Sequence, residues 1–271
     1  MKIDLHIHSS LSDGTDSPKS IVDKAKSLGI DCISITDHDC IGAIKLAKSY
    51  AQDNKIKYVN GVELSTFSVS EIHILGYCFD ENNSALLEKL DYFESKRKER
   101  ANMILDRLYD LGVKLDRDAL PTESASVGRL HIAKLMVAQG YATSVPDAFD
   151  RYLGINGKAY CPSKRITPMQ GVQLIKQAKG FPVIAHPLRF LQQNTLRTLV
   201  DGLKPFGLEG IEAYYPTHDK SVTDELNSLA RRYKLLATGG TDYHGENRNI
   251  ELGSVDVRLD GYALSRLNIN K

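Results

Sequence analysis

Short apolar, β-branched runs alternate along this chain with segments of helical periodicity, and histidine or aspartate recurs where the runs end. The expected strands are residues 2–7, 32–36, 58–62, 71–77, 182–185, 210–213 and 235–238, with helical patterns such as 18–28 and 41–51 between them. This alternation predicts a parallel α/β fold. Polar groups at the ends of most strands favour a closed, seven-stranded (β/α) barrel over an open sheet, which usually places its chemistry at one switch point.

Residues 81–160 break this alternation. Apolar side chains recur there near a helical period within a segment of strongly mixed charge, and further helical patterns cover residues 129–139 and 146–153. We expect a small all-helical insertion over residues 81–160 that packs as a lid over the face where the histidines and aspartates at the strand ends gather. Residues 1–80 and 161–271 would then form the barrel.

Composition narrows the class of protein. With 35 Lys and Arg against 34 Asp and Glu, the chain lacks the basic excess that duplex DNA binding requires, so no duplex DNA partner is expected. The cysteines show no CxxC spacing and are expected to be buried, reduced thiols; they are Cys32, Cys40, Cys78 and Cys161. No signal-peptide pattern or membrane-length apolar run is visible, so a cytoplasmic protein without a membrane partner is expected.

The first expected strand carries His6 and His8, two residues apart. Both side chains therefore leave the same face, roughly 6–7 Å apart along the chain, and two imidazoles placed in this way can hold one metal ion. Asp4 shares their face and could orient one imidazole from behind. A pair of buried histidines that are hydrogen-bonded to the backbone would give the same pattern, so the pair alone decides little.

Other single positions also have a structural explanation. Asp13 is a typical turn residue, and His73 and His186 could each be a histidine with a purely structural role. Together they are more informative, since six of the eight histidines fall at or beside expected strand ends, near carboxylates. Nitrogen and carboxylate donors suit Mn²⁺, Fe²⁺ and Zn²⁺. The candidates exceed what one ion can bind, so we predict two to three divalent ions. The metal-ligand candidates are His6, His8, Asp13, His38, Glu63, His73, His186, Asp242 and His244.

As a set, these motifs resemble those of the PHP (polymerase and histidinol phosphatase) superfamily. They are Asp4-Leu5-His6-Ile7-His8, Ser12-Asp13-Gly14, Thr36-Asp37-His38, Gly61-Val62-Glu63, His73, His186-Pro187 and Gly240-Thr241-Asp242-Tyr243-His244, in this order. The resemblance implies a distorted seven-stranded β/α barrel with up to three divalent metals that hydrolyses phosphoesters.

The resemblance also implies a division of the ligands. One metal would be held by His6, His8, Glu63 and Asp242, a second by Glu63, His73 and His186, and a third by Asp13, His38 and His244. The expected catalytic residues are Asp37, Glu63, His186 and Asp242, with Glu63 bridging two metals and Asp37 orienting a neighbouring imidazole.

Within the superfamily, the chain is similar to free-standing phosphoesterases that act on nucleoside monophosphates or 3′,5′-bisphosphates, some of which trim short 5′-phosphorylated RNA. The segment Gly128-Arg129-Leu130-His131 differs from the common Gly-Arg-Pro-His only at Leu130. Because guanidinium groups bind phosphate in a bidentate manner, Arg129 and Arg189 are the expected phosphate ligands, with His131 nearby. Surface salt bridges are the alternative for both arginines.

Three other functions stay open. Histidinol-phosphate phosphatases share the metal motifs. Amidohydrolases also begin with His-x-His, but they typically add a bridging lysine and a lone aspartate, whereas this chain has Glu63 and an Asp242 accompanied by His244. A metal-stabilised, non-catalytic module is the third. A phosphate-release screen on metal-loaded protein, with nucleotides, histidinol phosphate and short RNA, would distinguish them.

Overall fold

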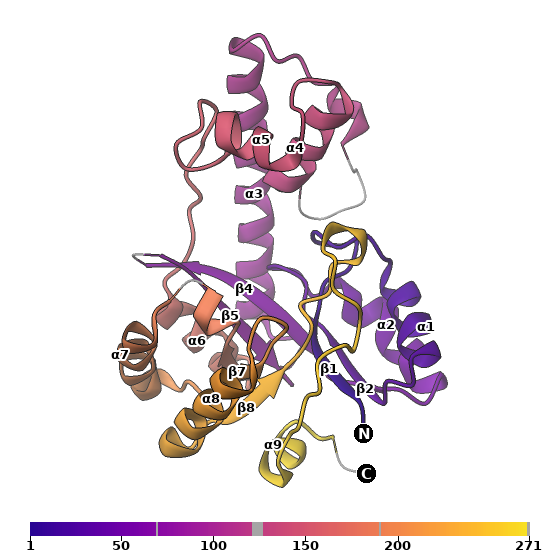
Figure 1. Ribbon diagram of the computed structural model, residues 1–271, viewed down its shortest axis with the longest axis vertical. Coiled ribbons are helices and arrows are strands. Elements are labelled where there is room, and N and C mark those ends of the chain that lie inside the picture. The colour runs from indigo at the N-terminus through magenta and orange to yellow at the C-terminus, as the bar shows by residue number, and fades with distance from the viewer. Residues whose placement is uncertain (69, 121–126, 190, 270–271) are drawn as a thin grey trace. The chain divides into compact units, whose positions relative to one another are not determined.

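The computed structural model describes residues 1–68, 70–120, 127–189 and 191–269. The chain forms two compact units, which the ribbon in Figure 1 shows. One unit is built from Met1–Lys89 and Arg165–Lys271 and contains strands and helices, and the other, Leu90–Lys164, is helical.

The strands of the α/β unit form two sheets. The first sheet is parallel and has the order β1 (Ile3–Ile7), β2 (Cys32–Ile35), β3 (Lys57–Tyr58). The second has the order β4 (Gly61–Phe67), β5 (Glu71–Tyr77), β6 (Phe181–Ile184), β7 (Gly210–Tyr214), β8 (Leu236–Gly239).

Strand β5 runs against both of its neighbours, whereas β6, β7 and β8 are parallel to one another. Only three residues connect Phe67 to Glu71, which is far too short for a parallel crossover. The expectation of an all-parallel arrangement was therefore wrong. The reversal has a consequence for the chemistry, because the beginning of β5 lies at the same edge as the carboxyl ends of β4 and β6.

The strands of the described residues form two separate sheets and do not close into the expected seven-stranded barrel. Single bridges, Ile7 to Tyr243 and His38 to Glu63, connect the two sheets in place of continuous ladders. The strand expected at residues 58–62 is divided between β3 and β4. At the start of β4, a side chain on Gly61 would place its Cβ 2.1 Å from Ser34 Oγ. The close approach of β4 to β2 thus depends on glycine at this position.

Helices cover the outer faces of both sheets. Helices α1 (Pro18–Ser27) and α2 (Gly42–Asp53) lie beside the three-stranded sheet, while α6 (Pro168–Gln177), α7 (Gln193–Leu203) and α8 (Lys220–Tyr233) flank the other (Figure 1). The short helix α9 (Gly261–Arg266) contacts β8. Side chains from both sheets, such as Leu5, Leu75 and Leu236, form one shared core. This core fixes the two sheets against each other and thereby the side chains at their edges.

The helical unit contains most of α3 (Ser84–Asp110), with α4 (Arg129–Ala138) and α5 (Val145–Ala148). A π-helical turn, Phe149–Leu153, continues α5. The helical patterns expected at residues 129–139 and 146–153 are thus observed. Ile104, Leu108, Ile132 and Met136 are buried in a core of the unit's own. That the unit covers the metal-bearing face stays a prediction.

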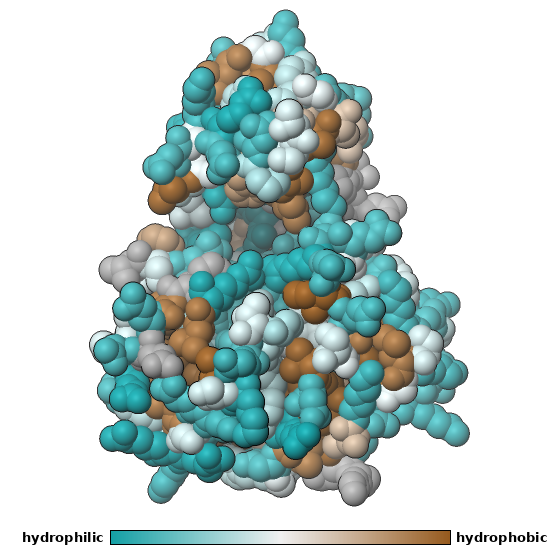
Figure 2. Space-filling model, in the orientation of Figure 1, coloured by the Kyte–Doolittle hydropathy of each residue, from teal (hydrophilic) through white to brown (hydrophobic). Residues whose placement is uncertain are grey.

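Hydrophilic residues cover most of the visible face of each unit, with hydrophobic residues in scattered groups (Figure 2). Among the helices of the described ranges, none is both long enough and apolar enough to cross a membrane. All four cysteines lie in these ranges without a disulfide. Cys32 and Cys161 are buried, as expected, whereas Cys40 and Cys78 are partly exposed.

Candidate metal centre

The structure brings all the expected metal ligands together within the α/β unit. They form overlapping groups whose donor atoms lie within 4.8 Å of one another: His8, Asp13, His38 and His244; His6, Glu63 and His186; His6, His8 and Asp242; and His38, Glu63 and His73. His6, His38, His186 and Asp242 lie at or just after the carboxyl ends of parallel strands. Glu63 and His73 instead lie inside β4 and β5, near the beginning of each strand.

Glu63 is at the centre of this cluster and is 1% exposed. Its Oε1 atom lies 2.9 Å from His73 Nδ1 and 2.9 Å from His186 Nε2. Its Oε2 atom lies 3.1 Å from His8 Nε2, 3.1 Å from His38 Nδ1 and 3.5 Å from His6 Nε2. The two oxygens therefore face two different sets of imidazoles, which is the geometry needed to bridge two cations.

Asp242 and Asp13 complete the cluster on either side of His8. Asp242 Oδ1 lies 3.2 Å from His8 Nε2 and 3.5 Å from His6 Nε2. Asp13 Oδ1 lies 3.5 Å from His8 Nδ1 and 3.2 Å from His244 Nε2. Asp242 is buried, whereas the Asp13 side chain is 27% exposed, so the cluster is more open toward Asp13.

Five buried ligand atoms of this cluster face one another or a carboxylate without making a hydrogen bond of good geometry. They are the Nε2 atoms of His6, His8 and His244, the Nδ1 atom of His38, and Glu63 Oε2. A buried polar atom without a partner is costly, and a cation placed among these atoms would satisfy them. Imidazole nitrogens mixed with carboxylate oxygens are the donors that Zn²⁺, Mn²⁺ and Fe²⁺ accept. The residues present therefore fit divalent metal ions.

The carboxylates of the cluster are held in their charged form. Burial raises the pKa of Glu63, but the imidazoles, His38 first, outweigh it and hold that pKa well below the usual range. The same balance of burial against imidazoles lowers the pKa values of Asp13 and Asp242. Three negative charges thus share one buried region and require positive charge nearby.

Without metal, that positive charge comes from protons on particular imidazoles. Burial acts to lower the pKa of His8 and of His73, but hydrogen bonds and charges from nearby carboxylates raise both to about 9. Burial dominates at His186 and His244 and lowers their pKa values. Protons and metal ions therefore compete for the same nitrogen atoms.

A buried carboxylate that we did not anticipate, Glu212 of β7, supports two of the ligands. Its Oε1 atom lies 2.9 Å from His6 Nδ1, and its Oε2 atom accepts a hydrogen bond from the backbone N–H of His186 at 2.6 Å. With the Nδ1 proton held in this way, the Nε2 lone pair of His6 faces Glu63 and Asp242. An acidic residue inside an apolar strand, residues 210–213, was the available signal, because a buried charge needs a partner.

We expected Asp4 to orient an imidazole, but its hydrogen bonds come from backbone groups and from Thr241. It accepts hydrogen bonds from the Thr241 N–H at 3.0 Å, the Thr241 hydroxyl at 2.6 Å and the Gly253 N–H at 2.9 Å. It also accepts one from the backbone N–H of His6. Asp4 therefore fastens β1 to the segment that carries Asp242.

Asp37 likewise takes a different part from the one expected. It accepts hydrogen bonds from the Ser9 N–H at 2.7 Å, from the Ser9 hydroxyl at 2.6 Å and from the Ser12 hydroxyl. These are contacts to a turn, not to the imidazole that we predicted. By fixing that turn, Asp37 positions Asp13, which lies at its end.

Backbone strain coincides with the cluster. His186 has φ = 24° and Asp242 has φ = 52°, both in the left-handed region that non-glycine residues rarely adopt. Such conformations persist where the surrounding structure determines them, and they concentrate at functional sites. Here the Glu212 carboxylate holds the His186 backbone in place.

The second carboxylate oxygen of Asp242, Oδ2, accepts hydrogen bonds from polar side chains at the edge, or rim, of the cluster. The donors are the Tyr215 hydroxyl at 2.8 Å, Arg189 Nη1 at 3.4 Å and Arg248 Nη1. Arg189 was expected near the site, whereas Tyr215 and Arg248 were not. Two guanidinium groups thus lie next to the metal ligands, and the Arg189 side chain is 39% exposed.

Arg129 and His131 lie in the helical unit and have partners within it. Arg129 Nη1 donates to the Leu153 carbonyl at 3.3 Å, and its guanidinium lies 5.5 Å from the centre of the Phe149 ring. His131 Nδ1 accepts from the Gly128 N–H at the start of α4. The expected contact of these two side chains with substrate stays a prediction.

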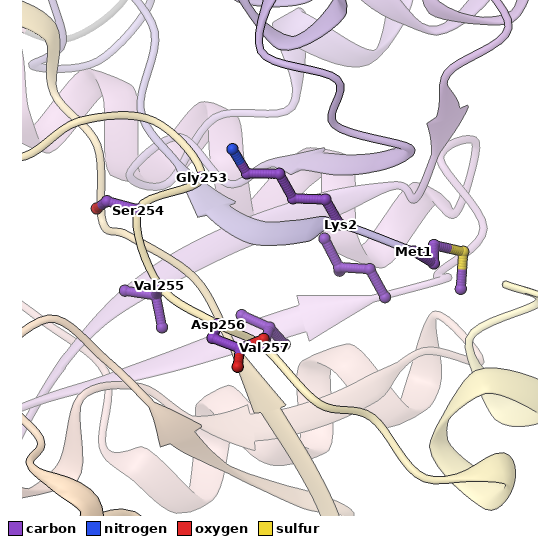
Figure 3. A pocket seen from close by; sticks show the side chains of 8 residues that line it. Met1, Lys2, Gly253, Ser254, Val255, Asp256 and Val257 are labelled. Carbon is purple, nitrogen blue, oxygen red and sulfur yellow. The ribbon is translucent and has the colours of Figure 1, made fainter.

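A cavity of about 380 Å³ lies apart from the cluster, beside the beginning of β1 (Figure 3). It is lined by Met1, Lys2, Ile3, Gly253, Ser254, Val255, Asp256 and Val257. None of these residues is a candidate ligand, and the one carboxylate among them, Asp256, is paired with Arg258. The cavity therefore adds nothing to the metal chemistry.

A family model described as the PHP domain matches residues 4–159, more than half of the chain. The chain belongs to the PHP domain family. The match includes six of the nine ligand candidates, namely His6, His8, Asp13, His38, Glu63 and His73.

Relatives of known name extend over almost the whole chain. A 5′-3′ exoribonuclease of Haemophilus influenzae is 32% identical over 255 residues, which cover 93% of each chain. A 3′,5′-nucleoside bisphosphate phosphatase of Chromobacterium violaceum is 30% identical over 247 residues, 89% of this chain and 87% of that one. A solved structure of an amidohydrolase from C. violaceum, with bound sulfate and no metal, has a TM-score of 0.87 at 27% identity and covers 99% of this chain and 96% of that one.

Proposed function

We propose that this protein is a metal-dependent phosphoesterase that hydrolyses phosphate monoesters of nucleotides or short 5′-phosphorylated RNA. The observation that carries the proposal is the position of Glu63, whose two oxygens face separate sets of buried imidazoles. Membership of the PHP family and the names of the relatives support the same reaction class.

We propose two to three divalent ions, of Mn²⁺, Fe²⁺ or Zn²⁺, held by the nine candidate ligands, with Glu63 shared between two of them. Bound ions of this kind lower the pKa of a coordinated water and neutralise charge that develops on phosphoryl oxygens. His186 and Asp242 are proposed as ligands at the reacting centre, and Asp37 as the residue that fixes the turn carrying Asp13.

The chain's own polar groups are proposed to orient the substrate. Arg189 lies at the rim beside Asp242, where its planar guanidinium can hold a phosphate through two parallel hydrogen bonds. Arg129 and His131 are proposed to contact a second phosphate from the helical unit. A second phosphate near the first is common to 3′,5′-bisphosphates and to RNA, and the relatives are named as a 3′,5′-nucleoside bisphosphate phosphatase and a 5′-3′ exoribonuclease.

The donor set also argues against amide hydrolysis, although one structural neighbour is described as an amidohydrolase. Amidohydrolases typically bridge their metals with a lysine, whereas the bridging position here belongs to Glu63. The nine groups that gather at the cluster are all histidine, aspartate or glutamate. This set resembles that of the PHP phosphoesterases.

The proposal is tested with metal-free protein reconstituted with Mn²⁺, by measuring the release of phosphate from the monoesters and the release of phosphate or mononucleotide from the RNA. The panel consists of AMP, a nucleoside 3′,5′-bisphosphate, a short 5′-phosphorylated RNA and histidinol phosphate. We expect release from the nucleotide substrates to exceed release from histidinol phosphate, and elemental analysis to find two to three ions per chain. Faster turnover of histidinol phosphate would overturn the substrate class, and protein that retains at most one ion would overturn the metal assignment.

A further inference from the structure

His73 lies between two carboxylates. Its Nδ1 atom is 2.9 Å from Glu63 Oε1, inside the cluster, and its Nε2 atom is 2.9 Å from Glu71 Oε1, outside it. When Glu71 accepts the Nε2 proton, the lone pair of Nδ1 is directed toward Glu63. An outer carboxylate that fixes the imidazole in this way is the usual support of a metal-ligating histidine.

Glu71 also has a cation of its own. Arg165 Nη1 lies 2.8 Å from the same Oε1 atom, and the Arg165 and Glu71 side chains are 16% and 32% exposed. Arg165 is the first residue of the α/β unit after the helical unit. Its neighbour Ile166 pairs with Thr66 and accepts a hydrogen bond from the Phe67 N–H. This pairing anchors the guanidinium beside the beginning of β5.

Within the described part of the chain, no lysine or arginine is paired with Glu212, the corresponding carboxylate behind His6. Glu212 is fully buried, and its hydrogen bonds go to His6 Nδ1 and to the His186 N–H. The two oxygens of Glu63 therefore lead to histidines supported in different ways. Behind His6 the full negative charge of Glu212 is available, whereas behind His73 the charge of Glu71 is shared with a guanidinium.

We propose that Arg165 acts through Glu71 as a positioning residue that weakens the binding of the metal ion held by His73. That ion would then exchange more readily than the ion held by His6. The inference rests on the metal-dependent function proposed above and specifies which of its metals is loosely held. A guanidinium next to Glu71 reduces the electron donation of His73 and adds positive charge near the ion. Glu71 holds the imidazole in position, while Arg165 limits how strongly the imidazole binds.

The test is a titration of metal-free protein with Mn²⁺, followed by calorimetry and by the electron paramagnetic resonance signal of free Mn²⁺. His73→Ala identifies the binding step in question, because that step disappears. We expect Glu71→Gln to weaken this step by about 10- to 100-fold, as loss of an outer carboxylate does. Arg165→Gln should instead tighten it by about three- to tenfold, and Arg165→Lys should leave it near the wild-type value.

The opposite signs of the two changes distinguish this inference from a structural role. A clamp that only holds His73 in place would make both Glu71→Gln and Arg165→Gln weaken binding, and this result would overturn the inference. An unchanged Mn²⁺ dissociation constant for this step in Arg165→Gln would overturn the inference as well. Glu209→Gln is the matched control, because that carboxylate is held by Lys176 and Arg266, which are not metal-ligand candidates.

Failure of this inference is distinguishable from failure of the proposed function. If wild-type protein binds two or three Mn²⁺ ions but the variants change the Mn²⁺ affinity in the direction opposite to the one expected, only the role of Arg165 is overturned. Wild-type protein that binds no Mn²⁺ would overturn both. Circular dichroism of each variant tests whether the fold is retained.

Discussion

Replacing Glu212 by glutamine keeps the shape of the side chain but removes the charge that His6 and His186 share. Glutamine offers one carbonyl oxygen and one NH₂ group where the carboxylate offered two acceptors. If the oxygen stays on the His186 N–H, the NH₂ group faces His6 Nδ1. The His6 proton must then move to Nε2, the atom that faces Glu63 and Asp242.

The size of the effect follows from these contacts. A hydrogen bond to a charged group contributes about 1.5–3 kcal/mol, which corresponds to roughly a 10- to 150-fold change in a binding constant. Loss of the outer partner of a metal-ligating histidine costs about 10- to 100-fold in metal affinity. Both estimates predict that Glu212→Gln lowers the affinity for the ion held by His6 by about 10- to 100-fold.

The assay is a Mn²⁺ titration of the metal-free variant, with kcat/KM measured both at limiting and at saturating Mn²⁺. Because the defect is in metal binding, activity should recover largely at saturating metal. Glu225→Gln, on the exposed surface of α8, serves as the control. Unchanged Mn²⁺ affinity in Glu212→Gln would refute the assignment of His6 Nε2 as the metal-facing atom.

Four further results are expected. Glu63→Gln should lower kcat by more than about 100-fold with an unchanged far-ultraviolet spectrum, and near-normal turnover would place the bridge elsewhere. In metal-free protein, the pKa values of His8 and His73 are raised from 6.5 to about 9, so their stabilisation is complete below pH 6.5 and is lost as the pH rises through about 9. Calorimetry should therefore show Tm falling over this range without metal and staying constant with Mn²⁺ bound. Asp4→Ala leaves buried hydrogen-bond donors without an acceptor and should lower the free energy of unfolding by about 3–5 kcal/mol in urea titrations, with a smaller loss for Asp4→Asn. Arg129→Ala should weaken kcat/KM for nucleotides by about 2–4 kcal/mol but barely affect p-nitrophenyl phosphate, and no loss on either would leave Arg129 a structural partner of its own unit.

The ligands were predictable from the sequence because they are rare residue types at recurring positions. Histidine and aspartate at the ends of apolar runs converge wherever those runs lie side by side in one sheet. Glu63 and His73 were harder to place, since they lie inside strands. Their level in the sheet depends on the bridge between His38 and Glu63 and on the reversed direction of β5.

The reversal of β5 was open to prediction, whereas the supporting contacts were not. Eight residues separate positions 62 and 71, too few for a parallel crossover of a dozen or more residues. By contrast, the contact of Glu212 with His6 joins residues 206 positions apart, and no local pattern specifies it. Asp37 was expected to orient a neighbouring imidazole, but its hydrogen bonds come from Ser9 and Ser12, which lie 28 and 25 positions away in the sequence, and no local pattern specifies these contacts.

The hydrogen bonds that Asp4 accepts from Thr241 connect residues 237 positions apart, and they have a consequence for how the protein matures during synthesis. Contacts of such long sequence separation form late, because the intervening chain must first be ordered. His6 and His8 therefore leave the ribosome long before Asp242 and His244 exist. A growing chain carries only part of the ligand set, and the ion proposed on His6, His8, Glu63 and Asp242 can be inserted only after the last strand has joined the sheet.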